Sequence, residues 1–203
     1  MDLISQLFSN PFAFFSIVIS LIISITIHEF AHAYVAYKLG DPTPKSQGRV
    51  TLNPLSHLDP LGSLLLVLFG FGWGRPVEFN PENLTYPKRD TGLIAAAGPA
   101  SNLLLGTLLI ILSRVLGVEV LAFVAYVNFF LAFFNLIPVY PLDGFNVVLG
   151  LLPYNLAYKW RELEQYSWVF LLIIVFTSLP GKIVTPIVQF TFNNIDNLVR
   201  LFL

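Results

Sequence analysis

Long apolar runs separated by segments rich in proline and glycine divide the chain into a few hydrophobic elements. The first run starts at Pro11, which suits a first helical turn, and continues to about residue 37, before Gly40-Asp41-Pro42 ends the pattern. Residues 91–116 and 119–137 form two more runs, and the short Gly117-Val118 link between them predicts a helical hairpin. These lengths are close to the roughly 20 residues that a helix needs to cross a bilayer.

The remaining segments are less regular. Residues 41–90 carry seven prolines, which exclude one continuous helix. Within them, 61–73 is apolar but short and punctuated by glycine, so it predicts a re-entrant or strand-like element, or an interfacial loop that only dips into the headgroups. We expect a fourth span at about 165–179, before Pro180-Gly181. Residues 183–203 alternate apolar and polar positions and predict an interfacial or broken span.

Composition places these elements in a membrane. Hydrophobic residues make up 56% of the chain and charged residues 11%, where a soluble domain carries about 25% charged residues. The expected fold is an all-α polytopic membrane protein with about four transmembrane helices, and residues 1–203 form a single membrane-embedded domain. The net charge of -1 gives no reason to expect nucleic acid as a partner. With no cysteine, a metal site has only His, Asp and Glu as ligands.

The distribution of Lys and Arg predicts the orientation of the helices. Most of these residues lie in 38–90 and 138–166, so the positive-inside rule places both connections in the cytosol and the N-terminus outside. The first helix then runs towards the cytosol, and its C-terminal part lies near the cytosolic face.

That part of the first helix contains His28, Glu29 and His32 in an HExxH pattern. Histidines four residues apart share one face of a helix and can hold one metal ion, and the glutamate between them can take a proton from a metal-bound water. A chance match on a helix is the alternative. It is disfavoured because two histidines and a carboxylate are expensive to bury in lipid unless they have partners.

Asp143 is the best candidate for a third ligand. Catalytic zinc usually has three protein ligands and an open position for water. Asp143 follows the third span, whose end is expected beside the HExxH segment. An ordinary Asp-Gly turn is the alternative for this residue.

Three motifs in order, HEFAH at 28–32, GPASN at 98–102 and NLIPVYPLDG at 135–144, resemble the site-2 protease family of intramembrane zinc metalloproteases. The resemblance implies a core of three helices around one zinc ion per chain, with His28, His32 and Asp143 as ligands and Glu29 as general base. It also implies cleavage of a substrate helix that has partly unwound.

Further similarity covers GDPT at 40–43, GRVTLNP at 48–54, HLDP at 57–60 and FGWGRPV at 71–77. It resembles the compact prokaryotic branch, without PDZ or CBS domains. Phe145-Asn146 departs from the family, where a small and a basic residue are common after the Asp-Gly pair. The implied location is a prokaryotic cell membrane, with the active site towards the cytosol.

Three other polar residues each have two or more interpretations. Asn135 resembles the family's asparagine near the metal and could donate to the developing oxyanion, or its amide could bond a free carbonyl at the end of its helix. Asn102 could serve the site or hold two helices together. His57 could be a ligand, a polar group near the metal or substrate, or a structural loop residue.

The sequence therefore predicts a zinc-dependent intramembrane endopeptidase that acts on a transmembrane protein in the lipid bilayer. A non-proteolytic membrane protein that binds or transports metal is the main alternative, because three ligands alone suffice to hold an ion. An unrelated zincin would need a downstream glutamate ligand in a helix, and none occurs in the interior of the other spans, where Glu119 only begins the third.

Overall fold

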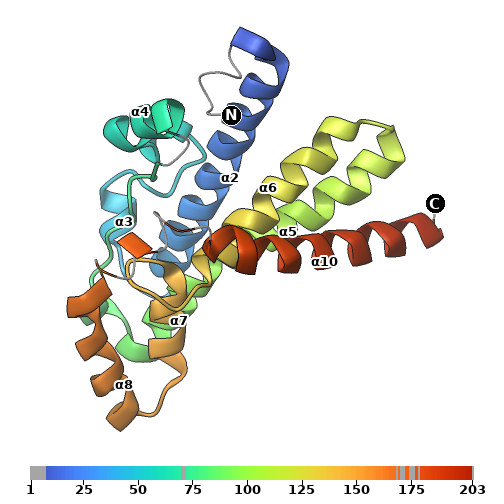
Figure 1. Cartoon of the computed structure of the whole chain (residues 1–203). Coiled ribbons are helices and arrows are strands. Elements are labelled where there is room, and N and C mark those ends of the chain that lie inside the picture. Colours follow the sequence, from blue (N-terminus) through green and yellow to red (C-terminus); the bar gives the residue numbers. More distant parts are fainter. Residues whose placement is uncertain are drawn as a thin grey trace.

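The computed structural model describes residues 8–69, 72–167, 169, 172–173, 177 and 179–202, and helices dominate them (Figure 1). Four helices are long: α2 (Pro11–Lys38), α5 (Pro87–Leu116), α6 (Glu119–Asn135) and α10 (Leu179–Phe202). Shorter helices lie between them: α3 (Thr43–Ser46), α4 (Pro60–Phe69), α7 (Asp143–Leu151) and α8 (Tyr154–Glu162), with 3-10 turns at Pro54–Ser56, Pro81–Asn83 and Leu163–Tyr166.

The helix predicted for the first apolar run is confirmed as α2. Its start is fixed locally, because Asn10 Oδ1 accepts a hydrogen bond from the backbone N–H of Ala13 at 3.1 Å and Pro11 occupies the first turn. The predicted hairpin is also present as α5 and α6. Its first helix begins four residues earlier than the hydrophobic pattern indicates, at Pro87, because the polar first turn is held by hydrogen bonds and not by apolar packing.

The hairpin packs against α2 on one side and α10 on the other. Its core contains Ile110 of α5 and Ala125 and Phe129 of α6, together with Val184 and Val188 of α10. At the far end of the hairpin, Arg114 pairs with Glu119 and with Asp196 of α10. These contacts hold α10 against the hairpin, and the C-terminal end of α10 lies beside the turn between α5 and α6.

The C-terminal prediction is corrected in one respect. Of the two alternatives for residues 183–203, the broken span is wrong, because α10 is one continuous helix from Leu179 to Phe202, and the interfacial location stays a prediction. Pro180 and Gly181 do not separate two elements, because a proline in a first helical turn loses no hydrogen bond that the helix would otherwise make. About half of the predicted fourth span at 165–179 lies outside the described residues.

The connection between α2 and α5 is irregular, as its prolines predict. The strand-like alternative for 61–73 is wrong for the described part, since Pro60–Phe69 is helical and the chain there contributes a single β-bridge between Leu58 and Gly74. Exposed leucines on α4 suit a lipid or interfacial surrounding, and the re-entrant path stays a prediction.

Hydrogen bonds to Asp41 anchor this connection to the end of α2. Its fully buried carboxylate accepts hydrogen bonds from the backbone N–H groups of Thr43 and Asn80, and from the side chains of Thr43 and Asn83. Burial alone would raise the pKa of Asp41, but these donors outweigh it and hold the pKa below its ordinary value. The 80–83 turn is therefore anchored against the end of the first helix.

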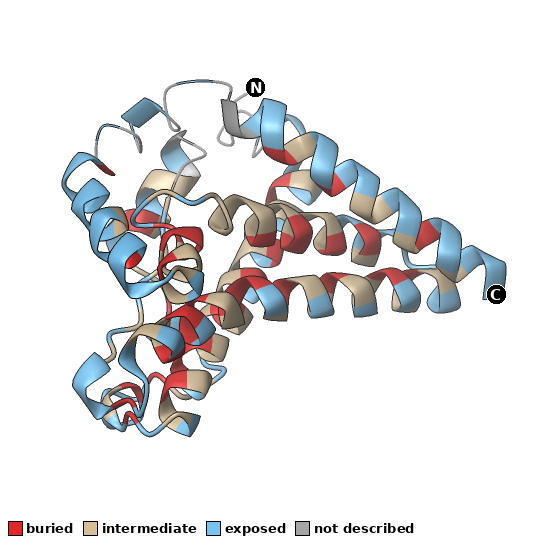
Figure 2. Cartoon of the chain, turned by 90° about the horizontal axis from the view of Figure 1, so that it is seen from below, coloured by how far each residue is buried: buried red, intermediate tan, exposed pale blue. Residues whose placement is uncertain are grey.

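Two described helices, α2 and α5, are long and apolar enough to cross a membrane, and α6 is a shorter apolar helix of 17 residues. Figure 2 shows buried residues where the helices face one another and exposed residues on their outer faces. Large apolar side chains occupy those outer faces, among them Leu104 (74% exposed) and Phe190 (71% exposed). An apolar outer surface of this kind suits a lipid environment.

Candidate functional site

His28, His32 and Asp143 come together from distant parts of the chain. The two histidines lie one turn apart on α2, and Asp143 is the first residue of α7. Their possible ligand atoms lie within 4.8 Å of one another. His28 Nε2 is 2.9 Å from Asp143 Oδ2, and His32 Nε2 is 3.3 Å from Asp143 Oδ1. The structure thus gathers the three residues that the sequence proposes as ligands.

This geometry fits a zinc ion. Ligand atoms about 2.0–2.1 Å from a tetrahedral zinc are separated by about 3.3 Å from one another, which is near the two observed separations. Asp143 Oδ2 is buried and accepts no hydrogen bond from the residues described. Two nitrogens and one carboxylate, with space for a fourth ligand, are a donor set typical of catalytic zinc.

Neighbouring carbonyl groups fix which nitrogen of each histidine faces the cluster. His32 Nδ1 lies 2.6 Å from the backbone oxygen of Ile94. Because a carbonyl oxygen can only accept, His32 Nδ1 carries a hydrogen, and Nε2 is the nitrogen turned towards Asp143. A proton or a cation must lie between Nε2 and the carboxylate oxygen, and with a metal bound Nε2 is the nitrogen available as ligand.

For His28 the same assignment follows from a chain of three side chains. Asn128 Nδ2 donates to the Val124 carbonyl at 2.9 Å, which leaves Asn128 Oδ1 to accept from Asn102 Nδ2 at 2.8 Å. Asn102 Nδ2 also donates to Ser24 O, so Asn102 Oδ1 faces His28 Nδ1 at 2.6 Å and accepts its hydrogen. His28 Nε2 is then free for the metal.

Both interpretations of Asn102 therefore describe part of its geometry, since this side chain joins α2, α5 and α6 and also orients His28. The sequence alone did not point to Asn128 as a residue of the site. Its signal was available, because an asparagine in the middle of the apolar 119–137 run needs a polar partner. Asn128 also precedes Asn135 by seven residues, which places the two on the same face of α6.

Two glycines allow the close approaches that build the cluster. A Cβ atom on Gly98 of α5 would lie 2.6 Å from His28 Nε2 and closer still to His32 Nε2, so the imidazoles need this residue to be glycine. A Cβ atom on Gly144 would collide with the backbone oxygens of Leu136 and Ile137 at the end of α6. The absence of a side chain at 144 lets α7 begin against that end and bring Asp143 to the histidines.

Glu29 lines the same cavity, and Arg49 is its nearest cation. Arg49 is 3% exposed, and its Nη2 lies 3.9 Å from Glu29 Oε2. The guanidinium donates to the carbonyls of Arg75 and Pro76, which fixes it between the 48–54 segment and the 72–77 segment. Burial lowers the pKa of Arg49 from its ordinary value, and the Glu29 carboxylate opposes that shift. Arg49 was not among the residues predicted for the site.

Asn135 also lines this cavity, and its amide donates to the Leu131 carbonyl one turn earlier at 2.9 Å. The observed bond satisfies the amide within its own helix.

His57 lies apart from the ligand cluster. It is fully buried, and its Nε2 is 2.7 Å from the Thr51 carbonyl, as expected for the structural interpretation of this residue.

The cavity has a volume of about 530 Å³ and is bounded by α2, α5, the end of α6, the start of α7 and the extended 72–79 segment. That size is within the range of small-ligand sites. Apolar and aromatic side chains form most of the wall, and the polar groups converge on one side, around Glu29, His28, His32 and Asp143. The arrangement can place one peptide group beside the metal ligands and the carboxylate.

Comparison with known proteins agrees with this chemistry. Residues 115–178 match the family model for peptidase family M50. YwhC of Bacillus subtilis, named as a zinc metalloprotease, is 39% identical over 200 residues, covering 92% of this chain and 90% of its own. Rip2 of Mycolicibacterium smegmatis, also named as a zinc metalloprotease, is 30% identical over 182 residues, covering 83% of this chain and 68% of its own. No solved structure matches the chain.

The first long helix carries HExxH, and a distant aspartate lies beside it. Together with these relatives, this arrangement identifies the chain as a zinc metalloendopeptidase of the integral-membrane class. The chain belongs to peptidase family M50, the site-2 protease family. Zinc is its cofactor.

Proposed function

We propose that this zinc metalloprotease cleaves a peptide bond within or next to a transmembrane helix of a membrane-protein substrate. One observation carries the proposal: the His28, His32 and Asp143 cluster is attached to an apolar helix long enough to span the bilayer. His28 follows Pro11 by 17 residues, which is about 25 Å along a helix and lies within a hydrocarbon core about 30 Å thick. A substrate must therefore reach the site at membrane depth.

In this proposal His28, His32 and Asp143 hold the zinc, and Glu29 is the general base. Bound zinc lowers the pKa of a water to about 7 and polarises the peptide carbonyl. Glu29 accepts a proton from the attacking water and passes it to the leaving amine. Arg49 keeps a positive charge beside the Glu29 carboxylate, and Asn102 and Ile94 keep both imidazoles turned with Nε2 towards the cluster.

Asn135 is the proposed donor to the oxyanion. Its side chain borders the cavity, and its bond to the Leu131 carbonyl duplicates a backbone interaction that the helix makes without it. Rotation of the side chain would free the amide at little cost. In another protease the loss of one such donor costs about 3–4 kcal/mol of transition-state stabilisation.

The proposed orientation places the site near the cytosolic face of a prokaryotic cell membrane. Helices α7 and α8 lie towards the end of the molecule where α2 ends, and the turn between α5 and α6 lies towards the other, whereas α4 in the 39–86 connection lies nearer the start of α2 (Figure 1). Single cysteines at Lys45 and Gly117 test this in a chain that has none of its own. A membrane-impermeant thiol reagent on intact cells should label only Gly117→Cys, and labelling of only Lys45→Cys would reverse the orientation.

Hydrolysis by purified protein in detergent tests the function itself. Synthetic transmembrane substrates are incubated with the wild type and with Glu29→Gln, His28→Ala and Asp143→Ala, and bound zinc is measured in the same samples. The proposal expects cleavage by the zinc-loaded wild type alone, with zinc retained only by Glu29→Gln among the variants. Zinc in both wild type and Glu29→Gln, with cleavage by neither across a broad panel, would favour metal binding or transport.

A further inference from the structure

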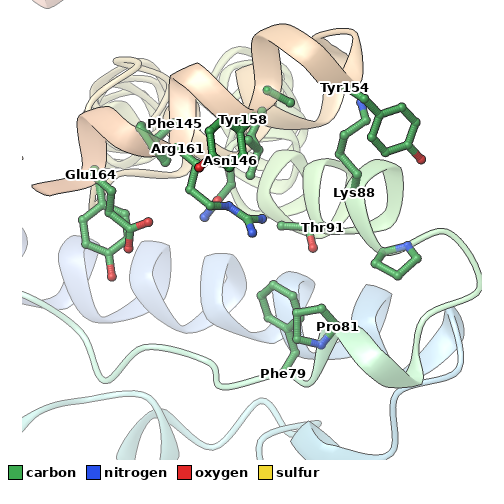
Figure 3. Close-up of a pocket in the computed structure, with 14 residues that line it drawn as sticks. Phe79, Pro81, Lys88, Thr91, Phe145, Asn146, Tyr154, Tyr158, Arg161 and Glu164 are labelled. Carbon is green, nitrogen blue, oxygen red and sulfur yellow. The ribbon is translucent and has the colours of Figure 1, made fainter.

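A second cavity adjoins the metal cavity and has no role in the chemistry described above. Its volume is about 810 Å³, and it lies between α7, α8, the first turn of α5 and the 79–81 segment (Figure 3). This volume is in the range of cavities that bind ligands. Aromatic rings and polar groups both line it, including Tyr154, Tyr158 and Arg161 of α8 and Thr91 of α5.

The two cavities adjoin along one wall. Phe79, Tyr140 and Asn146 line both of them. Helix α7 runs from Asp143 at the metal cluster, past Asn146, to Leu149 in the second cavity. Six residues of helix span about 9 Å, which an extended peptide covers with about three residues. An extended polypeptide in the metal cavity would therefore need only about three residues to reach the second one.

The wall formed by α8 is held by specific contacts. Trp160 Nε1 donates to the Phe145 carbonyl at 3.0 Å, and the two rings stack with centroids 5.4 Å apart. On the opposite side, Lys88 Nζ donates to the carbonyls of Gly150 and Leu152 and so fixes α5 to the end of α7. The cavity is consequently bounded by packed helices whose positions are fixed against one another.

Arg161 gives this cavity its chemical character. Figure 3 shows the guanidinium extending from α8 into the space between α7 and Phe79. The Arg161 side chain is exposed, and no residue that the structure describes forms a hydrogen bond or ion pair with it, although Glu164 lines the same cavity. Lys88, the other cation in the wall, is already engaged with two carbonyls. Of the two cations in the lining, the one without a partner is therefore the Arg161 guanidinium, and a guanidinium pairs best with a carboxylate.

We propose that this second cavity binds the substrate polypeptide that continues from the cleaved bond, with Arg161 pairing an acidic substrate residue about three to five positions away. The inference rests on the proposed cleavage of a membrane protein at the metal site. It identifies the recognised chemistry as an extended segment with an aspartate or glutamate, flanked by side chains that pack on Tyr154 and Tyr158.

Charge reversal tests the pairing. Synthetic substrates that differ only in carrying Glu or Lys three to five residues from the cleaved bond are compared by kcat/KM. The wild type should prefer Glu about three- to five-fold, the range of a partly exposed ion pair. Arg161→Glu should reverse this preference. Lys159→Glu makes the same charge change on α8 outside the cavity and should leave the preference as it is, whereas an equal effect from both variants would overturn the proposal.

A binding measurement separates this proposal from the proposed function. In the Glu29→Gln background, a cysteine at Tyr158 inside the cavity or at Lys159 outside it is tested for disulfide formation with a cysteine in the same substrate segment. The proposal expects crosslinking at Tyr158→Cys, reduced by Arg161→Glu, and little at Lys159→Cys. Equal crosslinking at both positions would refute the binding site, while crosslinking without any cleavage by the wild type would refute only the proteolysis.

Discussion

Asn128 Oδ1 accepts a hydrogen bond from Asn102 Nδ2 at 2.8 Å, and both side chains are completely buried between α2, α5 and α6. Through this bond the carbonyl of Val124, on a helix that supplies none of the three proposed ligands, determines how His28 is oriented. A residue without any contact to the metal is thus predicted to influence metal affinity.

Replacing Asn128 with alanine should lower the affinity for zinc by about ten- to a hundred-fold, the range for lost partners of metal-ligating histidines. The reason is that Asn102 is no longer fixed, and His28 can turn its ring or change tautomer. Competition with a calibrated chelator measures this affinity. Asn194→Ala is the matched control, because that amide bonds the Phe190 carbonyl at an exposed position of α10. Unchanged affinity in Asn128→Ala would contradict the prediction.

Gly98→Ala should abolish zinc binding and hydrolysis together. The added methyl group would lie 2.6 Å from His28 Nε2 and closer to His32 Nε2, so the imidazoles cannot keep their positions. Zinc per chain and helicity are to be measured on the same sample. Gly181→Ala provides the comparison, since a methyl group there meets no atom within 4 Å. Full zinc occupancy in Gly98→Ala would show that the site adapts.

Arg49→Met should reduce kcat about ten-fold or more while zinc binding is retained. The substitution removes the cation next to Glu29 and releases the 72–77 segment from its two carbonyl contacts, and small displacements of catalytic groups are costly. Arg49→Lys should recover part of the rate, because it restores the charge without the planar fork of donors. Steady-state kinetics with zinc quantification checks both variants. A wild-type kcat in Arg49→Met would remove Arg49 from the mechanism.

Asp41 should make the stability of the fold dependent on acid pH. Its pKa is held below its ordinary value in the folded protein, so its stabilising effect is fully present above the ordinary pKa of about 4 and is lost as the pH falls through the lower, folded pKa. Thermal unfolding in detergent should show Asp41→Asn below the wild type at pH 7, with the gap closing in acid. Glu82→Gln, in an exposed position of the same connection, serves as control. A gap that stays constant with pH would refute this origin.

Much of the helical framework could be predicted from the sequence because it depends on local patterns. The 11–37 run, its proline start and the short Gly117-Val118 link are local signals, and α2 and the hairpin agree with them. The end of the chain could not be predicted in this way. The polar positions of 183–203 suggest a break, but packing of Val184 and Val188 on α5 and α6 stabilises one continuous helix.

The same division applies to the candidate site. By itself, the sequence determined that His28, Glu29 and His32 share a helix, because the apolar 11–37 run contains all three. The spacing of four residues then brings the two histidines to one face of that helix. It also indicated Asp143 as the third ligand. Only the tertiary structure decided that Asp143 meets the histidines, that Asn128 orients His28 and that Arg49 lies beside Glu29. These contacts join residues far apart in the chain, and they depend on how closely three helices and a loop pack, which no local pattern of residues specifies.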